Sequence, residues 1–158
     1  MQAQKFLDEK VKKDIPELVV GSKNLTGSLK LEKFTELKRL YCPTNKITSL
    51  EVVNCFNLES ITCRDNQLTE LNIKKCPNLK TLDCSNNPLT NLNLKELTKL
   101  SELDISETNL ETSILAYLPE SLEKIICLNK KNRKCQSIIK ELKNYREDPT
   151  RGIYNLKK

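Results

Sequence analysis

The sequence predicts an α/β solenoid: a right-handed coil with a parallel concave β-sheet, a mostly extended or irregular convex side, and a helical cap at each end. The first observation behind this prediction is the spacing LxxLxCxxNxL, which occurs in residues 79–89, occurs with one Ile in place of a Leu in residues 37–47 and 58–68, and keeps its frame in residues 100–110. The second is the period of twenty-one residues between these copies. A fixed period of this length is typical of coils whose turns stack on one another.

Each copy of the spacing begins as a short strand. Leu82 and Cys84 alternate with polar residues, which is the pattern of a strand with one buried face. The Asn that follows is expected to end the strand, because its amide can both donate and accept hydrogen bonds where backbone groups lose their strand partners. We predict this structural role for Asn45, Asn66 and Asn87.

The repeat divides the chain into six turns between two caps. The turns occupy residues 15–130 and begin near residues 15, 37, 58, 79, 100 and 122. Apolar residues at helical spacing predict a capping helix over residues 1–14, in which we expect Phe6 to insert into the open end of the coil. The same pattern predicts a second capping helix over residues 131–146, followed by a polar tail, residues 147–158.

The seven cysteines favour buried thiols over a disulfide framework or a metal site. Four share one slot of the repeat with Val20 and Ile105, and two share another with Phe34, Leu97 and Leu118. A slot that also accepts these residues selects a buried apolar side chain, which a free thiol satisfies. The chain has no His and no CxxC pair, so no metal is expected. The predicted buried thiols are Cys42, Cys63, Cys84, Cys127, Cys55 and Cys76.

Composition and motifs narrow the functional classes. No apolar segment approaches the roughly 18 residues that cross a bilayer, and the N-terminus is too charged for a secretory signal, so we expect a soluble cytoplasmic chain. No His is present to activate a Ser or Cys nucleophile, and neither GxxxxGK[ST] nor GxGxxG occurs. We therefore expect no enzyme activity and no cofactor, and we expect a monomer.

The spacing and its period resemble the leucine-rich repeat family over residues 15–127. The segments NLTGSLKLEKFTELKRLYC and DISETNLETSILAYLPESLEKIIC are similar to a large fungal group of that family, some members of which carry a protein kinase domain. The resemblance implies a non-catalytic scaffold that binds another protein, such as a signalling adaptor or a recruiting arm.

Strand alternation predicts which residues face a partner, because the neighbours of an inward residue point outward. The outward set contains a basic and aromatic group on the second and third turns and an acidic group on the fourth and fifth. Tyr and Arg often carry the energy of interfaces, so we expect a partner protein with a complementary stripe of acidic and then basic residues. The predicted partner-binding residues are Arg39, Tyr41, Thr62, Arg64, Asp83, Glu102, Asp104 and Glu107.

The net charge of +6 supports an alternative function. Residues 120–158 contain eleven Lys or Arg and five acidic residues, so the whole excess lies in this region. A basic segment of this kind can bind nucleic acid or an anionic membrane through their phosphates. The alternative to either role is a solvated, basic cap.

Overall fold

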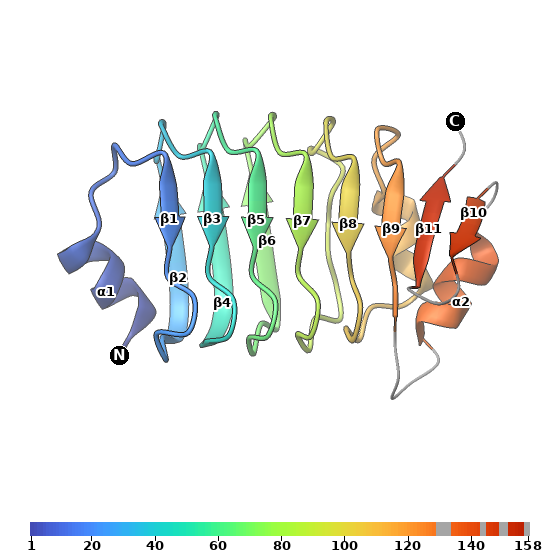
Figure 1. Ribbon diagram of the computed structural model, residues 1–158, viewed down its shortest axis with the longest axis horizontal. Coiled ribbons are helices and arrows are strands. Elements are labelled where there is room, and N and C mark those ends of the chain that lie inside the picture. Colours follow the sequence, from blue (N-terminus) through green and yellow to red (C-terminus); the bar gives the residue numbers. More distant parts are fainter. Residues whose placement is uncertain (129–133, 143–144, 149–151, 157–158) are drawn as a thin grey trace.

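The chain forms a coil whose turns stack side by side between two capped ends (Figure 1). The structure is a computed structural model that describes residues 1–128, 134–142, 145–148 and 152–156. Six short parallel strands lie next to one another along one side of the coil, which makes about five turns between the first and the last. These strands are β1 (Glu17–Val19), β3 (Arg39–Tyr41), β5 (Ser60–Thr62), β7 (Thr81–Asp83), β8 (Glu102–Asp104) and β9 (Lys124–Ile126).

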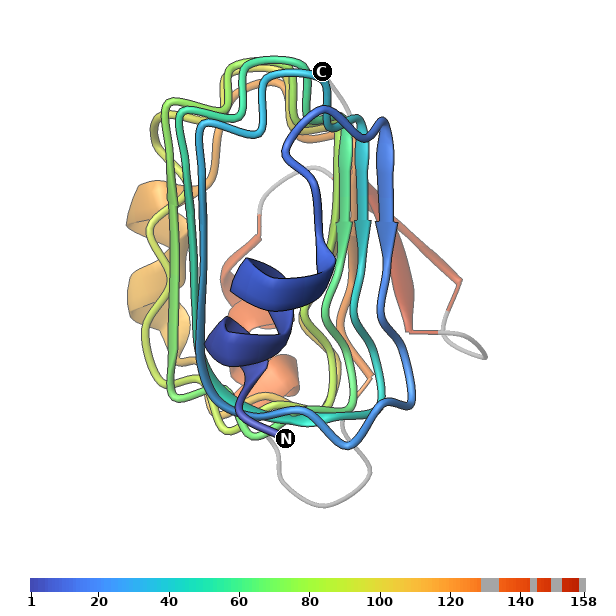
Figure 2. The same cartoon turned by 90° about the vertical axis from the view of Figure 1, so that its left-hand side faces the viewer.

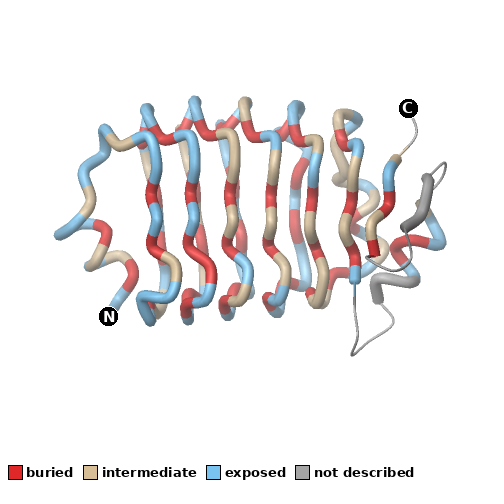
Figure 3. The backbone as a smooth tube through the Cα atoms, in the orientation of Figure 1, coloured by how far each residue is buried: buried red, intermediate tan, exposed pale blue. Residues whose placement is uncertain are grey.

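We call the sheet that these strands form the long sheet. Its register places equivalent residues of successive turns beside one another, so that Leu40 lies opposite Ile61, Ile61 opposite Leu82, and Leu82 opposite Leu103. Each of these side chains is at most 1% exposed. The core is therefore a set of aliphatic rows that run through all turns, and Figure 3 shows the buried positions recurring from turn to turn.

The opposite side of the coil contains a short sheet of three parallel strands, β2 (Thr26–Glu32), β4 (Lys46–Val53) and β6 (Glu70–Lys74). The two sheets face each other across the core (Figure 2). In the fourth turn residues 91–95 are not a strand, and the fifth turn contains the 3₁₀ helix η1 (Thr112–Tyr117). The expectation of a mostly extended or irregular convex side is confirmed.

The helix α1 (Ala3–Lys10) covers the open end of the first turn (Figure 2). Ala3 and Leu7 are the buried residues of this helix, whereas Phe6 is only partly buried, so the prediction that Phe6 inserts is wrong. Backbone contacts set this orientation, because the Thr26 N–H donates to the Met1 carbonyl oxygen at 2.9 Å and ties the start of the chain to β2. The Ala3–Leu7 pair, four residues apart on one helix face, then points at the core.

The C-terminal end differs from the predicted helix and polar tail. The helix α2 (Lys134–Glu141) buries Ile138 and Ile139 and packs on η1. Two further strands follow, β10 (Tyr145–Asp148) and β11 (Ile153–Leu156), where the sequence predicted the end of a helix and a tail. β11 pairs antiparallel with β9, with Ile153 opposite Ile126. It covers an edge that would otherwise expose unpaired backbone groups, because no further turn follows β9.

Candidate protein-binding face

The candidate site is the outward face of the long sheet, the face predicted to be concave. Each coil strand is three residues long, with a buried middle residue and two more exposed neighbours. The third residues of the strands form a row along the face, which we call the central row. β11 extends this row, because Ile153 pairs with Ile126. The central row is Val19, Tyr41, Thr62, Asp83, Asp104, Ile126 and Ile153.

The first residues of the strands carry charges that are already paired across neighbouring turns. Arg39 donates a hydrogen bond to the Glu17 carboxylate, and Lys124 Nζ lies 3.3 Å from Glu102 Oε2. The pairs involve exposed or half-exposed side chains, and ion pairs in such positions contribute little to stability. Their effect on recognition is larger than their effect on stability. The Arg39–Glu17 pair and the Lys124–Glu102 pair each present much less net charge to a partner than an unpaired Arg39 or Glu102 would.

Arg64, which follows β5, also lies close to acidic groups. Its guanidinium is 3.7 Å from an Asp65 carboxylate oxygen and 3.9 Å from one of Asp83. The predicted basic group on the second and third turns is therefore largely neutralised within the chain. The sequence predicted a basic group here, whereas ion pairs between side chains cancel most of its charge in the structure.

Asp83 and Asp104 are the acidic pair of the central row, and they lie directly opposite each other on β7 and β8. Asp83 accepts hydrogen bonds from the Ser85 hydroxyl at 2.6 Å and from the Ser85 N–H at 3.1 Å. Asp104 accepts one from the Ser106 N–H at 2.9 Å. Like charges in opposite positions of neighbouring strands destabilise a sheet, so this pair is unfavourable in the isolated chain.

Burial raises the pKa of Asp104, and Asp83 adds to that effect. Within the described part of the chain, no Lys or Arg forms an ion pair with Asp104, and Arg64 offsets the shift only from a distance. The carboxyl group of Asp104 is half-buried and lacks an ion-pair partner among the described Lys and Arg side chains. A cation supplied by another molecule would stabilise it.

Apolar side chains lie at both ends of the central row. The described residues include five large apolar side chains that are exposed, and two of them belong to the central row: Val19 at 63% and Tyr41 at 40%. At the other end of the row, Ile126 and Ile153 are half-buried. A Cβ at Gly21 would lie 3.3 Å from the Tyr41 ring and from Pro43, so the absence of a side chain there makes room for the tyrosine. Exposed apolar groups gathered on one face are typical of interaction surfaces.

The structure places six of the eight predicted partner-binding residues in the strands of the long sheet and two outside them. Arg39, Tyr41, Thr62, Asp83, Glu102 and Asp104 belong to the strands of the long sheet. Arg64 follows β5 directly and is exposed, whereas Glu107 lies in the corner after β8 with a φ of 53°, outside the central row. Sequence reasoning did not include Ile153, because its position depends on the antiparallel return of the chain.

The Asn side chains lie at the corner where each coil strand ends. Asn66 Nδ2 donates to the carbonyl oxygens of Cys42 and Cys63, each at 3.0 Å, and its Oδ1 accepts from the Ile47 N–H at 3.1 Å. Asn45 and Asn87 make the equivalent bonds in their own turns. All three are at most 9% exposed, so each amide joins one turn to the previous one within the core.

Five of the predicted buried thiols are free and buried: Cys42, Cys55, Cys63, Cys76 and Cys84. Burial raises the pKa of Cys42 to about 12 and also raises that of Cys63, so these thiols stay protonated and unreactive. Cys127 is buried but disulfide-bonded, so the prediction of a free thiol is wrong there. Cys127 follows the last strand of the coil, and its N–H donates to the Gly152 carbonyl oxygen at 2.9 Å.

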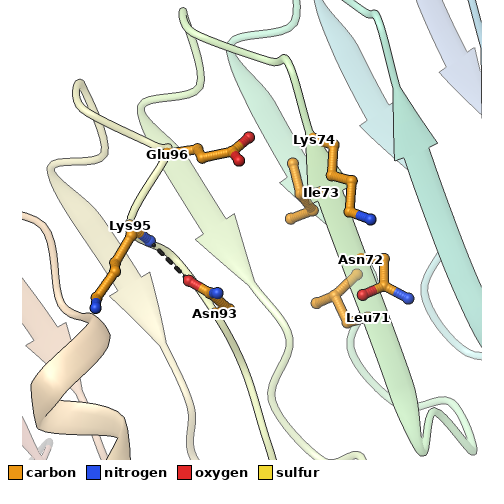
Figure 4. A pocket seen from close by; sticks show the side chains of 7 residues that line it. All are labelled: Leu71, Asn72, Ile73, Lys74, Asn93, Lys95 and Glu96. Atoms are coloured by element: carbon orange, nitrogen blue, oxygen red, sulfur yellow. Dashed lines mark hydrogen bonds between the residues drawn. The ribbon is translucent and has the colours of Figure 1, made fainter.

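A second surface feature lies on the opposite side of the coil, where the short sheet ends (Figure 4). A shallow hollow of about 260 Å³ separates β6 from the next turn. Its lining residues are Leu71, Asn72, Ile73, Lys74, Asn93, Lys95 and Glu96. No backbone hydrogen bond joins residues 69–75 to residues 90–96, so the hollow is a gap between two turns. Its polar groups do not converge in the way that catalysis requires.

The described residues contain no group of three or more His, Cys, Asp or Glu that could hold a metal ion. None of the described helices is both long and apolar enough to cross a membrane. The basic region that suggested polyanion binding falls mostly outside the described residues. The side chains of this region that the structure does not describe are Lys130, Lys131, Arg133, Lys134, Lys143, Arg146, Arg151, Lys157 and Lys158.

Comparison with known proteins supports the architecture. Residues 56–96 match the family model of leucine-rich repeats, in two copies. The matched segment covers the third and fourth turns, and the same register continues into the turns on either side. The fold is therefore a solenoid whose third and fourth turns match leucine-rich repeats. No curated protein sequence matches the chain.

Proposed function

We propose that this leucine-rich-repeat solenoid is a non-catalytic module that binds another protein on the outward face of the long sheet. Leucine-rich repeats are typically used for protein binding. One observation carries the choice of face: the central row combines exposed Val19 and Tyr41 with the half-buried acidic pair Asp83 and Asp104. Both features are unfavourable for a surface that only contacts water.

The face is an open row of side chains, which supports a protein partner over a small molecule. Small ligands are usually enclosed in concave pockets that bury most of their surface. Four hollows of the surface are lined by other residues and not by the central row. An array of side chains at the regular spacing of a sheet suits an extended protein surface better.

A role as a signalling adaptor or recruiting arm belongs to the same proposal. It is supported by the segments around the repeats, which are similar to fungal leucine-rich-repeat proteins that include kinase fusions. A module without catalytic residues would act there by bringing a partner to a neighbouring domain.

The test is a pull-down from native extract with the Asp83→Lys, Asp104→Lys double variant. The matched control is the Glu70→Lys, Glu96→Lys double variant, which changes the net charge equally but alters exposed residues on the opposite side of the coil. We expect the control to retain the proteins that bind the wild type and the Asp83, Asp104 variant to lose them. Circular dichroism checks that both variants fold. Equal retention by all three proteins would contradict the proposed binding face.

A further inference from the structure

The central row has a polar centre and two apolar ends. Thr62 precedes the acidic pair Asp83 and Asp104, Val19 and Tyr41 lie at one end, and Ile126 and Ile153 lie at the other. This order matches neither a uniformly charged surface nor a uniformly apolar one. A partner that fits it needs apolar, then cationic, then apolar groups in sequence.

Strand spacing converts this order into distances. Neighbouring strands lie about 4.8 Å apart, so Tyr41 lies about 12 Å from the midpoint of the Asp83–Asp104 pair, and Ile153 lies about 12 Å on the other side. Ile126 lies about 7 Å from the same midpoint. An extended peptide advances about 3.3 Å per residue and turns alternate side chains to the same face, at intervals of about 6.6 Å. In such a peptide, the side chain two residues after a central one therefore lies at about the distance of Ile126. The side chains four residues before and four residues after the central one lie at about the distances of Tyr41 and Ile153.

The chemistry of the centre favours a basic side chain over a metal ion. Two carboxylates converge there, which is fewer than the six to eight oxygen ligands that Ca²⁺ takes. A Lys or Arg brings its own hydrogen-bond donors and can bridge two carboxylates. The local charge also allows this, because Arg39 is paired with Glu17 and the excess positive charge of the chain lies in residues 120–158. Arg64 lies 3.9 Å from Asp83, so a ligand cation would share that carboxylate with Arg64, whereas Asp104 has no Lys or Arg ion partner among the described side chains.

We propose that the central row binds an extended basic segment of a partner protein. The segment's Lys or Arg contacts Asp83 and Asp104, and its apolar residues lie over Tyr41 on one side and over Ile126 and Ile153 on the other. The inference rests on the proposed function, which assigns protein binding to this face, and adds the chemistry of the partner segment. Recognition then depends on a cation with apolar residues four positions before it and two and four positions after it, or on the same order reversed.

The test is selection from a displayed library of random peptides on the folded, full-length chain. We expect the enriched peptides to share a Lys or Arg with apolar residues at the spacings given above. The best peptide is then measured by calorimetry on the wild type and on the Asp83→Asn, Asp104→Asn variant, which keeps the shape of both side chains. We expect roughly tenfold weaker binding or more by the variant, because the ligand cation loses both carboxylates.

Two further variants separate the possible failures. Tyr41→Ala probes the same face without changing charge, and Glu70→Gln with Glu96→Gln removes two acidic groups on the opposite side. Peptides that lack a basic residue, or that bind the Asp83→Asn, Asp104→Asn variant as tightly as the wild type but lose affinity with Tyr41→Ala, would overturn the basic segment and leave the binding face intact. A selection without enrichment, or binding weakened only by the Glu70, Glu96 variant, would overturn both proposals.

Discussion

Asn66 illustrates how a single side chain joins two turns of the coil. Its amide donates to the carbonyl oxygen of Cys63 in its own turn and to that of Cys42 in the previous turn, and it accepts from the Ile47 N–H. The three backbone groups are buried at a corner where no strand partner is available. An Asn fits this corner because its side chain has both a donor and an acceptor.

Replacing Asn66 with Ala is expected to lower the free energy of unfolding by about 3 kcal/mol. More than one buried backbone group loses its hydrogen-bond partner, and each such loss costs about 1–3 kcal/mol. The control is Asn72→Ala, which removes an exposed amide from β6 and should change stability by less than about 0.5 kcal/mol. Urea unfolding of both variants measures the difference. Equal midpoints would show that the Asn corner does not hold the turns together.

The carboxyl group of Asp104 makes stability depend on pH. Burial raises its pKa above the ordinary value of 3.8, so the folded chain binds this proton more tightly than the unfolded chain. Stability therefore falls as the pH rises from just below that ordinary value through the raised pKa. This loss of stability is the electrostatic cost of holding Asp104 half-buried beside Asp83 on the proposed binding face.

Asp104→Asn removes this cost while keeping an oxygen for the Ser106 N–H. We expect the variant to have a higher Tm than the wild type at neutral pH and a smaller advantage in acid, where Asp104 of the wild type is protonated. Calorimetry over a range of pH measures both values. Glu36→Gln removes the same charge from an exposed position and should show no such pH-dependent gain. A lower Tm for Asp104→Asn at neutral pH would count against the electrostatic interpretation.

Among the elements, β11 has the most specific requirement for its position. Its return alongside β9 is fixed at both ends, since the Cys127 N–H donates to the Gly152 carbonyl oxygen at 2.9 Å and the Leu156 N–H donates to that of Glu123 at 2.7 Å. Gly152 has a φ of 59°, and a Cβ there would lie 3.0 to 3.2 Å from Leu128. Glycine is therefore needed both for its backbone conformation and for the close approach.

Gly152→Ala is expected to weaken the pairing of β11 with β9 while leaving the inner turns intact. Hydrogen exchange at the Cys127 and Leu156 amides should become faster, whereas exchange at the Cys63 amide, which donates to the Asp83 carbonyl oxygen, should not change. The expected cost is more than about 1 kcal/mol, since the substituted residue must adopt an unfavourable φ without space for its side chain. Unchanged exchange at Cys127 and Leu156 would contradict the assigned role of Gly152.

Some elements could be predicted from the sequence and others could not, for a physical reason. The rows of the coil depend on residues that recur every twenty-one positions, so the inward places of Leu40, Ile61 and Leu82 follow from local spacing. β11 has no such signal, because its pairing depends on a long-range return of the chain that leaves no period in the sequence. The helix η1 also lies outside the repeated pattern, because it occurs in the fifth turn only.

Some features of the candidate site could likewise be predicted from the sequence, and others could not. Alternation along three-residue strands is enough to place Tyr41, Asp83 and Asp104 outward. It does not reveal that Arg39 is paired with Glu17, because ion pairs between turns depend on side-chain rotamers. The sequence therefore predicted a basic group and an acidic group, whereas in the structure Arg64 lies 3.9 Å from Asp83, and the Asp104 carboxylate and the apolar ends are the features that a partner can use.

At the scale of the whole molecule, the solenoid has no single central core, because each turn contacts only the turns next to it. An interior turn has two such interfaces and a terminal turn has one, with α1 covering the free end of the first. Stability should therefore respond differently to the same substitution in an interior turn and in a terminal turn.

Leu82→Ala and Leu18→Ala test this property with the same loss of side-chain atoms. Leu82 is fully buried between the neighbouring turns, so its truncation should cost about 2–5 kcal/mol and should raise amide exchange throughout the coil. Leu18 lies in β1, where truncation should loosen the first turn alone. The Val20 amide, which donates to the Tyr41 carbonyl oxygen, should then exchange faster, while the Cys84 amide on Asp104 keeps its protection. Loss of protection at both amides in Leu18→Ala would show instead that the coil unfolds as one cooperative unit.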